Sequence, residues 1–322
     1  MKRIFLIFCS LFISNICWSA DEYPNRPITF ILAVEPGSDG DVLARPLMQR
    51  VSKILGQPIL IVNKPGAGSV IGYKEIHAAK PDGYTLGWTS ATIITNKLQG
   101  VSNLDYRDFT QLGAYATFFP ILIASNSSDV KFTNMQEVVA YAKANPGKIN
   151  LATAGVGQSW WVGAKTFLTG TNLDMTGVPV TGAGAAVATL VAGGHAELGV
   201  SGLASARPML QGGQVRYIAP IADGRASAPY DKFPTLKELG YNASWESTNA
   251  IIGPPNLPKD ITATLVAAIE KAANDPEFIK YVTDRDARWE YLAPDKIFPS
   301  FDKRRTIVRE IMQKAGLLKE SS

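Results

Sequence analysis

The segment Ile28-Thr-Phe-Ile-Leu-Ala-Val34 is a short apolar run rich in strand-forming residues, which is typical of a buried strand. It ends at Pro36-Gly-Ser-Asp-Gly-Asp41, after which residues 42–55 place apolar side chains at helical spacing. Another strand and helix are expected within 59–79, and a third strand at Tyr84–Trp88. Strands that alternate with helices through glycine-rich turns predict an α/β fold with parallel strands.

The rest of the chain repeats this alternation of strands and helices, and its C-terminal third is helical. Strands are expected at Pro120–Ala124, Ile149–Thr153, Val178–Val180, Leu198–Ser201 and Val215–Ile221, and helices at 134–143, 160–168 and 185–191. A proline-rich segment at 254–258 separates this half from a C-terminal third, whose helices are predicted at 261–273, 277–283 and 303–314. At 322 residues the chain is long enough for about two domains.

The composition narrows the class of protein. The 322-residue chain is 46% hydrophobic and 19% charged, which suits a protein with a large core and excludes wholesale disorder. Its 32 Lys and Arg residues nearly balance 28 Asp and Glu residues, for a net charge of +4. The longest basic run is Lys303-Arg304-Arg305, so no nucleic-acid partner is expected.

Residues 1–19 have the pattern of a secretory signal peptide. Two basic residues precede an apolar run from Ile4 to Cys17, and Cys17-Trp-Ser19 fits the end of a cleavable leader. A transmembrane anchor is the alternative, but the run is shorter than the ~20 residues that a membrane crossing needs. Both cysteines of the chain lie in this leader, so the exported protein would have no thiol for catalysis or metal binding.

Two turns, Pro36–Asp41 and Ala154–Ser159, lie where a predicted strand ends and a helix begins. The first turn of a helix has amide N–H groups without intrahelical partners, and the positive end of the helix dipole lies behind them. A carboxylate is a natural ligand for such a place. Two of these turns, one in each half of the chain, would hold one anion from opposite sides; the alternative is that both are only tight connections.

Three tryptophans are candidates for the wall of a ligand site. Trp160 and Trp161 follow the second turn directly, and Trp88 ends a predicted strand in the first half. An indole can wall a ligand pocket, where it stacks on a planar group or excludes water. Packing in the core is the alternative for each of them, and the sequence leaves both open.

Catalytic chemistry has few candidates in this sequence. The chain has only two histidines and no Gly-x-Ser-x-Gly or Walker motif. The segment 182–187 resembles a dinucleotide-binding turn, but Val187 fills a position that needs Gly or Ala. We therefore expect no cofactor and no metal. An enzyme would depend on carboxylates and lysines such as Asp39, Asp41 and Lys165.

Several motifs occur in the order and spacing of a known family. They are Tyr23-Pro-Asn-Arg-Pro-Ile28, Pro36-Gly-Ser-Asp-Gly-Asp41 with Ala44-Arg45, Asn63-Lys-Pro-Gly-Ala-Gly68, Pro81-Asp-Gly-Tyr-Thr-Leu86, Asp108-Phe-Thr110, Asn145-Pro-Gly147 and Gly253-Pro-Pro255. By this collinear set the chain resembles the Bug family, the TctC-like periplasmic solute-binding receptors of tripartite tricarboxylate transporters. The resemblance covers essentially the whole chain after the leader.

The resemblance implies a two-lobed α/β fold of the type II periplasmic-binding-protein class, a Venus flytrap with a hinge and an interlobe cleft. Residues 20–122 and 249–322 would form lobe I and residues 123–248 lobe II, after the signal peptide at 1–19. Such a protein would be a periplasmic monomer without catalytic activity, which captures a small carboxylate and presents it to an inner-membrane permease. The alternatives are a secreted α/β enzyme acting on a carboxylate, or a carboxylate sensor for a two-component system.

The family's ligand-clasping loops identify the candidate site in this chain. The predicted ligand-binding residues are Gly37, Ser38, Asp39, Gly40, Asp41, Trp88, Thr89, Ser90, Ala91, Thr153, Gly157, Gln158, Ser159, Trp160, Trp161, Pro179, Val180, Thr181, Gly182 and Ser201. The sequence departs from the family pattern at four of them. Ser38 replaces a second glycine, Gln158 and Trp161 replace a serine and a histidine, and Ser201 replaces an aspartate. These changes favour an aromatic or otherwise apolar-bodied carboxylate over an α-amino acid.

Overall fold

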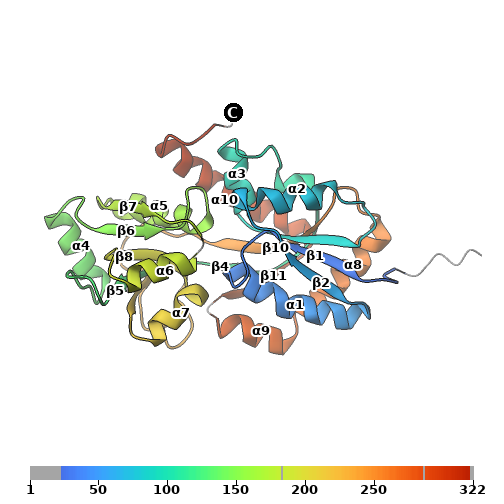
Figure 1. The fold of residues 1–322 in the computed structure, drawn as a ribbon, viewed down its shortest axis with the longest axis horizontal. Coiled ribbons are helices and arrows are strands. Elements are labelled where there is room, and N and C mark those ends of the chain that lie inside the picture. The colour runs from blue at the N-terminus through green and yellow to red at the C-terminus, as the bar shows by residue number, and fades with distance from the viewer. Residues whose placement is uncertain (1–22, 183, 286, 320–322) are drawn as a thin grey trace, which may run out of the picture.

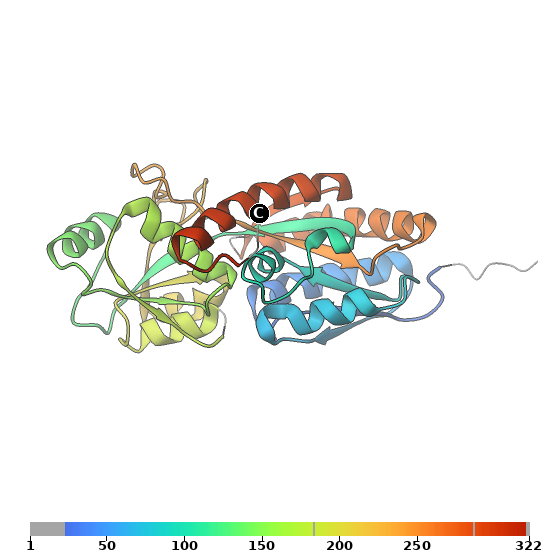
Figure 2. The same ribbon diagram turned by 90° about the horizontal axis from the view of Figure 1, so that it is seen from above.

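The computed structural model describes residues 23–182, 184–285 and 287–319. Two lobes lie end to end along the long axis of the molecule, and each has its own sheet flanked by helices (Figures 1 and 2). The predicted signal peptide at 1–19 lies outside the described residues. Among the residues that are described, no helix is long and apolar enough to cross a membrane.

Lobe I is built on a six-stranded sheet with the strand order β11-β4-β10-β3-β1-β2. Its strands are β1 (Ile28–Leu32), β2 (Ile59–Asn63), β3 (Thr85–Thr89), β4 (Thr110–Phe118), β10 (Ser247–Gly253) and β11 (Arg288–Leu292). Its helices are α1 (Asp39–Leu55), α2 (Val70–Ala78), α3 (Thr92–Leu98), α8 (Lys259–Ala273), α9 (Pro276–Thr283) and α10 (Pro294–Lys314). Strand β1 pairs in parallel with β2 and β3, whereas β10 is antiparallel to both β3 and β4.

Lobe II is built on a five-stranded sheet with the order β7-β6-β8-β5-β9. Its strands are β5 (Pro120–Ser125), β6 (Asn150–Thr153), β7 (Thr176–Pro179), β8 (Leu198–Gly202) and β9 (Val215–Pro220). Its helices are α4 (Met135–Ala144), α5 (Ser159–Thr171), α6 (Gly184–Ala192) and α7 (Leu203–Gln211). Strand β6 pairs in parallel with β7 and β8, and β5 is antiparallel to β8 and β9.

The sequence predicted the parallel strands of both lobes, but the sheets are mixed. The strands that it did not identify are β4, β10 and β11, all neighbours in the lobe I sheet. Strand β4 reads TQLGAYATF, so alanine and glycine take positions where β-branched residues give the usual strand signal. Helices α3 and α7 were also not predicted: α3 has only seven residues, and α7 begins directly after β8 without an intervening turn.

The chain passes between the lobes at two places in the sheets. Residue Phe119 alone separates β4 of lobe I from β5 of lobe II, and the segment 221–246 returns the chain from β9 to β10. Helix α10 extends from lobe I to contact α5, and Arg304 donates a hydrogen bond of 2.9 Å to the carbonyl of Glu246. The lobes are therefore joined by two strand connections and one long helix.

The largest apolar core belongs to lobe I but includes residues of lobe II. Trp160, Trp161 and Val162 at the start of α5, together with Ala154 and Trp245, belong to the same buried cluster as the lobe I strands. Two further clusters fill lobe II on the two faces of its sheet. The start of α5 is thus packed where the two lobes meet.

Candidate ligand-binding site

A cavity of about 290 Å³ lies between the two lobes, at the ends of their strands. Because β1, β2 and β3 run parallel, their carboxyl ends share one edge of the lobe I sheet, and the carboxyl ends of β6, β7 and β8 share an edge in lobe II. Ligands of open α/β sheets bind outside such carboxyl ends. Both edges contribute to the lining of this cavity, so it has walls from both lobes.

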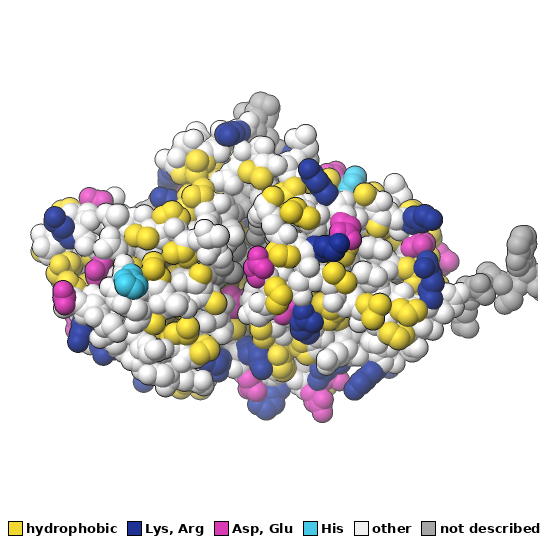
Figure 3. Space-filling view, viewed as in Figure 1, with side chains coloured by type: hydrophobic (Ala, Val, Ile, Leu, Met, Phe, Trp, Pro, Cys, Tyr) yellow, Lys and Arg dark blue, Asp and Glu magenta, His cyan; other side chains and the backbone are white. Residues whose placement is uncertain are grey.

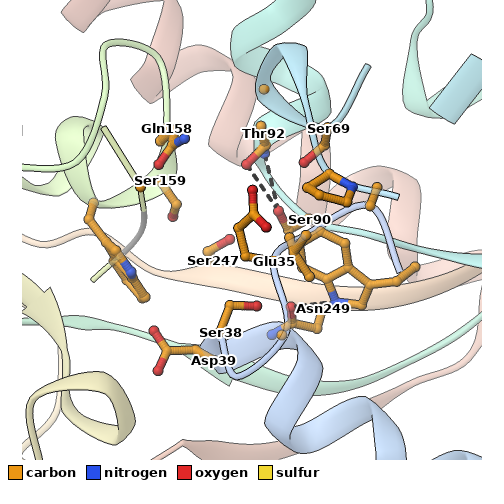
Figure 4. Close-up of a pocket in the computed structure, with 18 of the residues that line it drawn as sticks. Glu35, Ser38, Asp39, Ser69, Ser90, Thr92, Gln158, Ser159, Ser247 and Asn249 are labelled. Atoms are coloured by element: carbon orange, nitrogen blue, oxygen red, sulfur yellow. Dashed lines mark hydrogen bonds between the residues drawn. The ribbon is translucent and has the colours of Figure 1, made fainter. Parts of the chain in front are cut away.

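The structure brings half of the predicted site residues to this cavity. Those that line it are Ser38, Asp39, Gly40, Trp88, Ser90, Gln158, Ser159, Trp160, Thr181 and Gly182. Those that lie outside its lining are Gly37, Asp41, Thr89, Ala91, Thr153, Gly157, Trp161, Pro179, Val180 and Ser201. Figure 4 shows Gln158 and Ser159 on one side of the cavity, and Ser90 and Thr92 on the other.

Sequence reasoning missed a second group of lining residues. They are Ala33, Val34, Glu35, Pro65, Gly66, Ala67, Gly68, Ser69, Thr92, Phe118, Ser247 and Asn249. The loop 65–69 follows β2, so it is a third strand-to-helix turn at the same sheet edge, and its position after a parallel strand could have identified it. Ser247 and Asn249 lie on β10, which the sequence did not predict, so no signal pointed to them.

The β1–α1 turn is held in one conformation by its own side chains. Ser38 is the N-cap of α1, and its hydroxyl lies 3.5 Å from the amide of Asp41. The carboxylate of Asp41 accepts hydrogen bonds from the Gly37 amide at 3.0 Å, from Arg45 at 2.8–3.0 Å and from Asn63 at 2.8 Å. Burial raises the pKa of Asp41, but these hydrogen bonds outweigh it and bring the pKa below its usual value. Asp41 therefore fixes the turn from behind rather than facing the cavity.

Asp39 is a buried side chain that connects the lobes. It lies in the first turn of α1, yet its carboxylate accepts hydrogen bonds from the amide and hydroxyl of Ser205 in α7, at 3.2 and 2.9 Å. The Trp160 side chain of α5 is a further hydrogen-bond partner. Burial raises the pKa of Asp39 to about 6, against the opposing effect of these hydrogen bonds. The position is tight, since a Cβ on Gly202 would lie 2.1 Å from Asp39 Oδ2.

The start of α5 faces the cavity from lobe II. Gln158 is its N-cap but makes no side-chain capping bond, and the Ser159 hydroxyl accepts a 3.0 Å hydrogen bond from the Trp245 indole. The amides of the first turn have no intrahelical acceptors. Together with the start of α1, this helix gives the cavity two N-termini, one from each lobe.

The sequence left open whether each of three tryptophans walls the ligand pocket or packs in the core, and the structure distinguishes them. All three are buried, but Trp88 and Trp160 line the cavity. Trp161 lies outside the lining and has the Lys165 ammonium 5.5 Å from its ring centroid. The Trp88 indole donates a 2.8 Å hydrogen bond to the buried Asn249 Oδ1. Gly40 makes room for it, because a Cβ there would lie 2.9 Å from Trp88 Cζ2.

Neither His77 nor His195 lines the cavity, and the His77 ring packs edge-on against Phe109 with the ring centroids 5.6 Å apart. No group of three His, Cys, Asp or Glu side chains among the described residues is placed to hold a metal ion. On the face drawn in Figure 3, cationic and anionic side chains are interspersed rather than gathered into a basic patch.

Residues 43–314 match the model of the TctC family, described as the tripartite tricarboxylate transporter family receptor. The chain belongs to the TctC family. Among curated relatives of this TctC receptor, a UPF0065 protein of Cupriavidus necator is 29% identical over 306 residues, which is 93% of this chain and 90% of the relative. BugT of Bordetella pertussis is 27% identical over 307 residues, covering 94% and 91% of the two chains.

Solved structures agree with the two-lobed fold of this TctC receptor. A periplasmic transporter matches with a TM-score of 0.82 at 26% identity, over 92% of this chain and 99% of the other. A Rhodopseudomonas palustris protein solved with adipate matches with a TM-score of 0.84 at 23% identity, over 92% and 99%. MatC of Rhodopseudomonas palustris, solved with malate, matches with a TM-score of 0.77 at 24% identity, over 90% and 99%. The chain has the fold of the family's solute-binding proteins.

Proposed function

We propose that this receptor captures a small carboxylate between its lobes in the periplasm and presents it to an inner-membrane permease. The observation that carries the proposal is the pair of helix N-termini, at α1 and α5, that border one cavity from opposite lobes. Free amides and hydroxyls from both sides suit a carboxylate group, because charge-assisted hydrogen bonds are the strongest of their kind. The adipate and malate bound by two proteins of the same fold belong to this ligand class.

The energetics of such a site are sufficient for a transport receptor. Micromolar binding requires about 8 kcal/mol. Hydrogen bonds to a charged group contribute roughly 1.5–3 kcal/mol each, before the entropy lost on association. Several hydrogen bonds and an apolar contact with Trp88 or Trp160 would supply this total. Ligand contacts with both lobes would add to the stability of the closed form.

The same proposal implies that the two lobes move about a hinge and that the protein binds its ligand without converting it. The elements from β1 to β4 and from β10 to α10 would move as lobe I, and those from β5 to β9 as lobe II, in a monomer that performs no catalysis. The crossings therefore lie at Phe119 and just before Ser247, rather than at 122 and 249 as the sequence predicted. Mass spectrometry of the bound carboxylate over time would detect turnover, which would favour an enzyme instead.

Isothermal titration calorimetry tests the central claim. The purified protein is titrated with adipate, malate, benzoate, hexanoate and 6-aminohexanoate, and we expect at least one to bind with micromolar affinity. Small-angle scattering of the same samples should show a more compact particle with the bound probe. Absence of binding across the panel, together with no co-purifying acid in native mass spectra, would refute carboxylate capture.

A further inference from the structure

Glu35 is a lining residue of the cavity that no sequence motif singled out. It follows β1, and Figure 4 shows its carboxylate directed into the cavity, between Ser159 of lobe II and Ser90 of lobe I. Glu35 is solvent-exposed, and no hydrogen bond or ion pair to its side chain is found within the described residues. Its acidic group is therefore available to a ligand.

The charge of the cavity is unusual for a site that binds an anion. Among the described lining residues, Glu35 and Asp39 carry acidic groups, and none is Lys, Arg or His. Asp39 is already engaged by Ser205 across the lobes, so Glu35 is the acid that faces the cavity without a partner. The positive ends of two helices can hold one carboxylate, but a second carboxylate beside Glu35 would meet a like charge.

The cavity wall also holds groups that suit a cation. Trp88, Trp160 and Phe118 line the same cavity, and aromatic faces attract ammonium groups. The Ser90 and Thr92 hydroxyls can accept hydrogen bonds from an ammonium group as well. A ligand with a carboxylate at one end and a protonated nitrogen at the other would satisfy both halves of the site.

We infer that Glu35 sets the specificity of this receptor for a zwitterion, a carboxylate whose far end carries an ammonium group, and excludes dicarboxylates. The inference rests on the proposed capture of a carboxylate. In the sequence, Ser201 replaces the aspartate of the family pattern, and this change argues against an α-amino acid ligand. Ser201 lies outside the lining and donates its hydroxyl to the carbonyl of Gly184, whereas Glu35 supplies an acid from lobe I.

A matched set of probes tests this assignment. Adipate and 6-aminohexanoate have similar length and differ in whether the far end is a carboxylate or an ammonium group, and hexanoate has neither. We expect calorimetry to show 6-aminohexanoate binding at least tenfold more tightly than adipate. Glu35→Gln keeps the shape of the side chain without its charge, and should bring that ratio to within about threefold of one.

The control is Glu310→Gln, on the exposed surface of α10, which should leave the ratio of the two affinities unchanged. If adipate or hexanoate binds the natural protein as tightly as 6-aminohexanoate, the role of Glu35 is refuted while carboxylate capture stands. If the ratio is large but survives Glu35→Gln, the selectivity lies elsewhere and the role of Glu35 is again refuted. If none of the three probes binds, this inference falls, and the wider panel decides whether carboxylate capture falls with it.

Discussion

Replacing Gly202 by alanine should hold the two lobes apart. Gly202 ends β8 in lobe II, and a Cβ at this position would lie 2.1 Å from Oδ2 of Asp39 in lobe I, far inside the 3.4 Å at which ordinary contact begins. The backbone of Gly202 has φ −76° and ψ 147°, which alanine adopts without strain. The added methyl group therefore conflicts with the closed arrangement of the lobes rather than with the local backbone.

The size of the effect follows from the cost of overpacking. An added methyl in a tight site costs about 1–3 kcal/mol, which corresponds to a loss of roughly 5- to 150-fold in affinity if closure accompanies binding. Calorimetry with the tightest probe of the panel measures the loss, and small-angle scattering should show that the variant stays extended. Gly177→Ala is the matched control, because a Cβ there has nothing within 4 Å.

Thermal unfolding of the empty protein separates the interlobe clash from damage within lobe II. A Cβ at 202 would also lie 2.9 Å from Cζ2 of Trp160, in the same lobe. If that contact dominates, the midpoint of unfolding of the empty variant falls by several degrees. Unchanged affinity, or a loss of stability without any change in the scattering, would refute the reasoning.

Three further changes probe the same region. Burial raises the pKa of Asp39 from 3.8 to about 6 in the folded protein. The contribution of its protonated form to stability is therefore fully present well below pH 3.8 and is lost as the pH rises through about 6. At about 1.4 kcal/mol per unit, urea unfolding from about pH 3 to about pH 7 should show the natural protein losing about 3 kcal/mol relative to Asp39→Asn, and a constant difference would contradict the raised pKa. Asp41→Ala removes the acceptor that closes the β1–α1 turn on the Gly37 amide and should cost about 1.5–3 kcal/mol of unfolding free energy; a stability equal to that of the natural protein would mean that the turn holds without it. Trp88→Phe leaves the buried Asn249 Oδ1 without its donor, so denaturation should report a loss of about 1–3 kcal/mol, and a neutral result would show that another donor replaces the indole.

The parallel strands and the turns that follow them were predictable, because they have local signals. Apolar runs such as Ile28–Val34 and glycines at the turn positions predict strand-to-helix corners, and two corners of this kind do border the cavity. Strand β10 has no such signal, because its role depends on pairing with β3 and β4 far away in sequence. Ser247 and Asn249 could not be identified as lining residues without that pairing.

The assignment of individual side chains was less predictable than the location of the site. Successive residues of a helix point about 100° apart, so only one of Trp160 and Trp161 can face the cavity, and the sequence does not say which. The structure places Trp160 there. Glu35 illustrates the same limit. It is solvent-exposed, as a charged residue before a turn ordinarily is, and only the structure shows that it also lines the cavity.

The shared core has a consequence for how quickly cargo is exchanged. Trp160 and Trp161 belong to lobe II yet are buried in the cluster centred on lobe I. Separating the lobes must bring part of these indoles into water. The free-energy cost of exposing this apolar surface raises the barrier to ligand release. A captured molecule would therefore have a long residence time in free solution. Docking to a membrane component that covers the parted indoles would lower this barrier and make unloading fast only at the place of delivery.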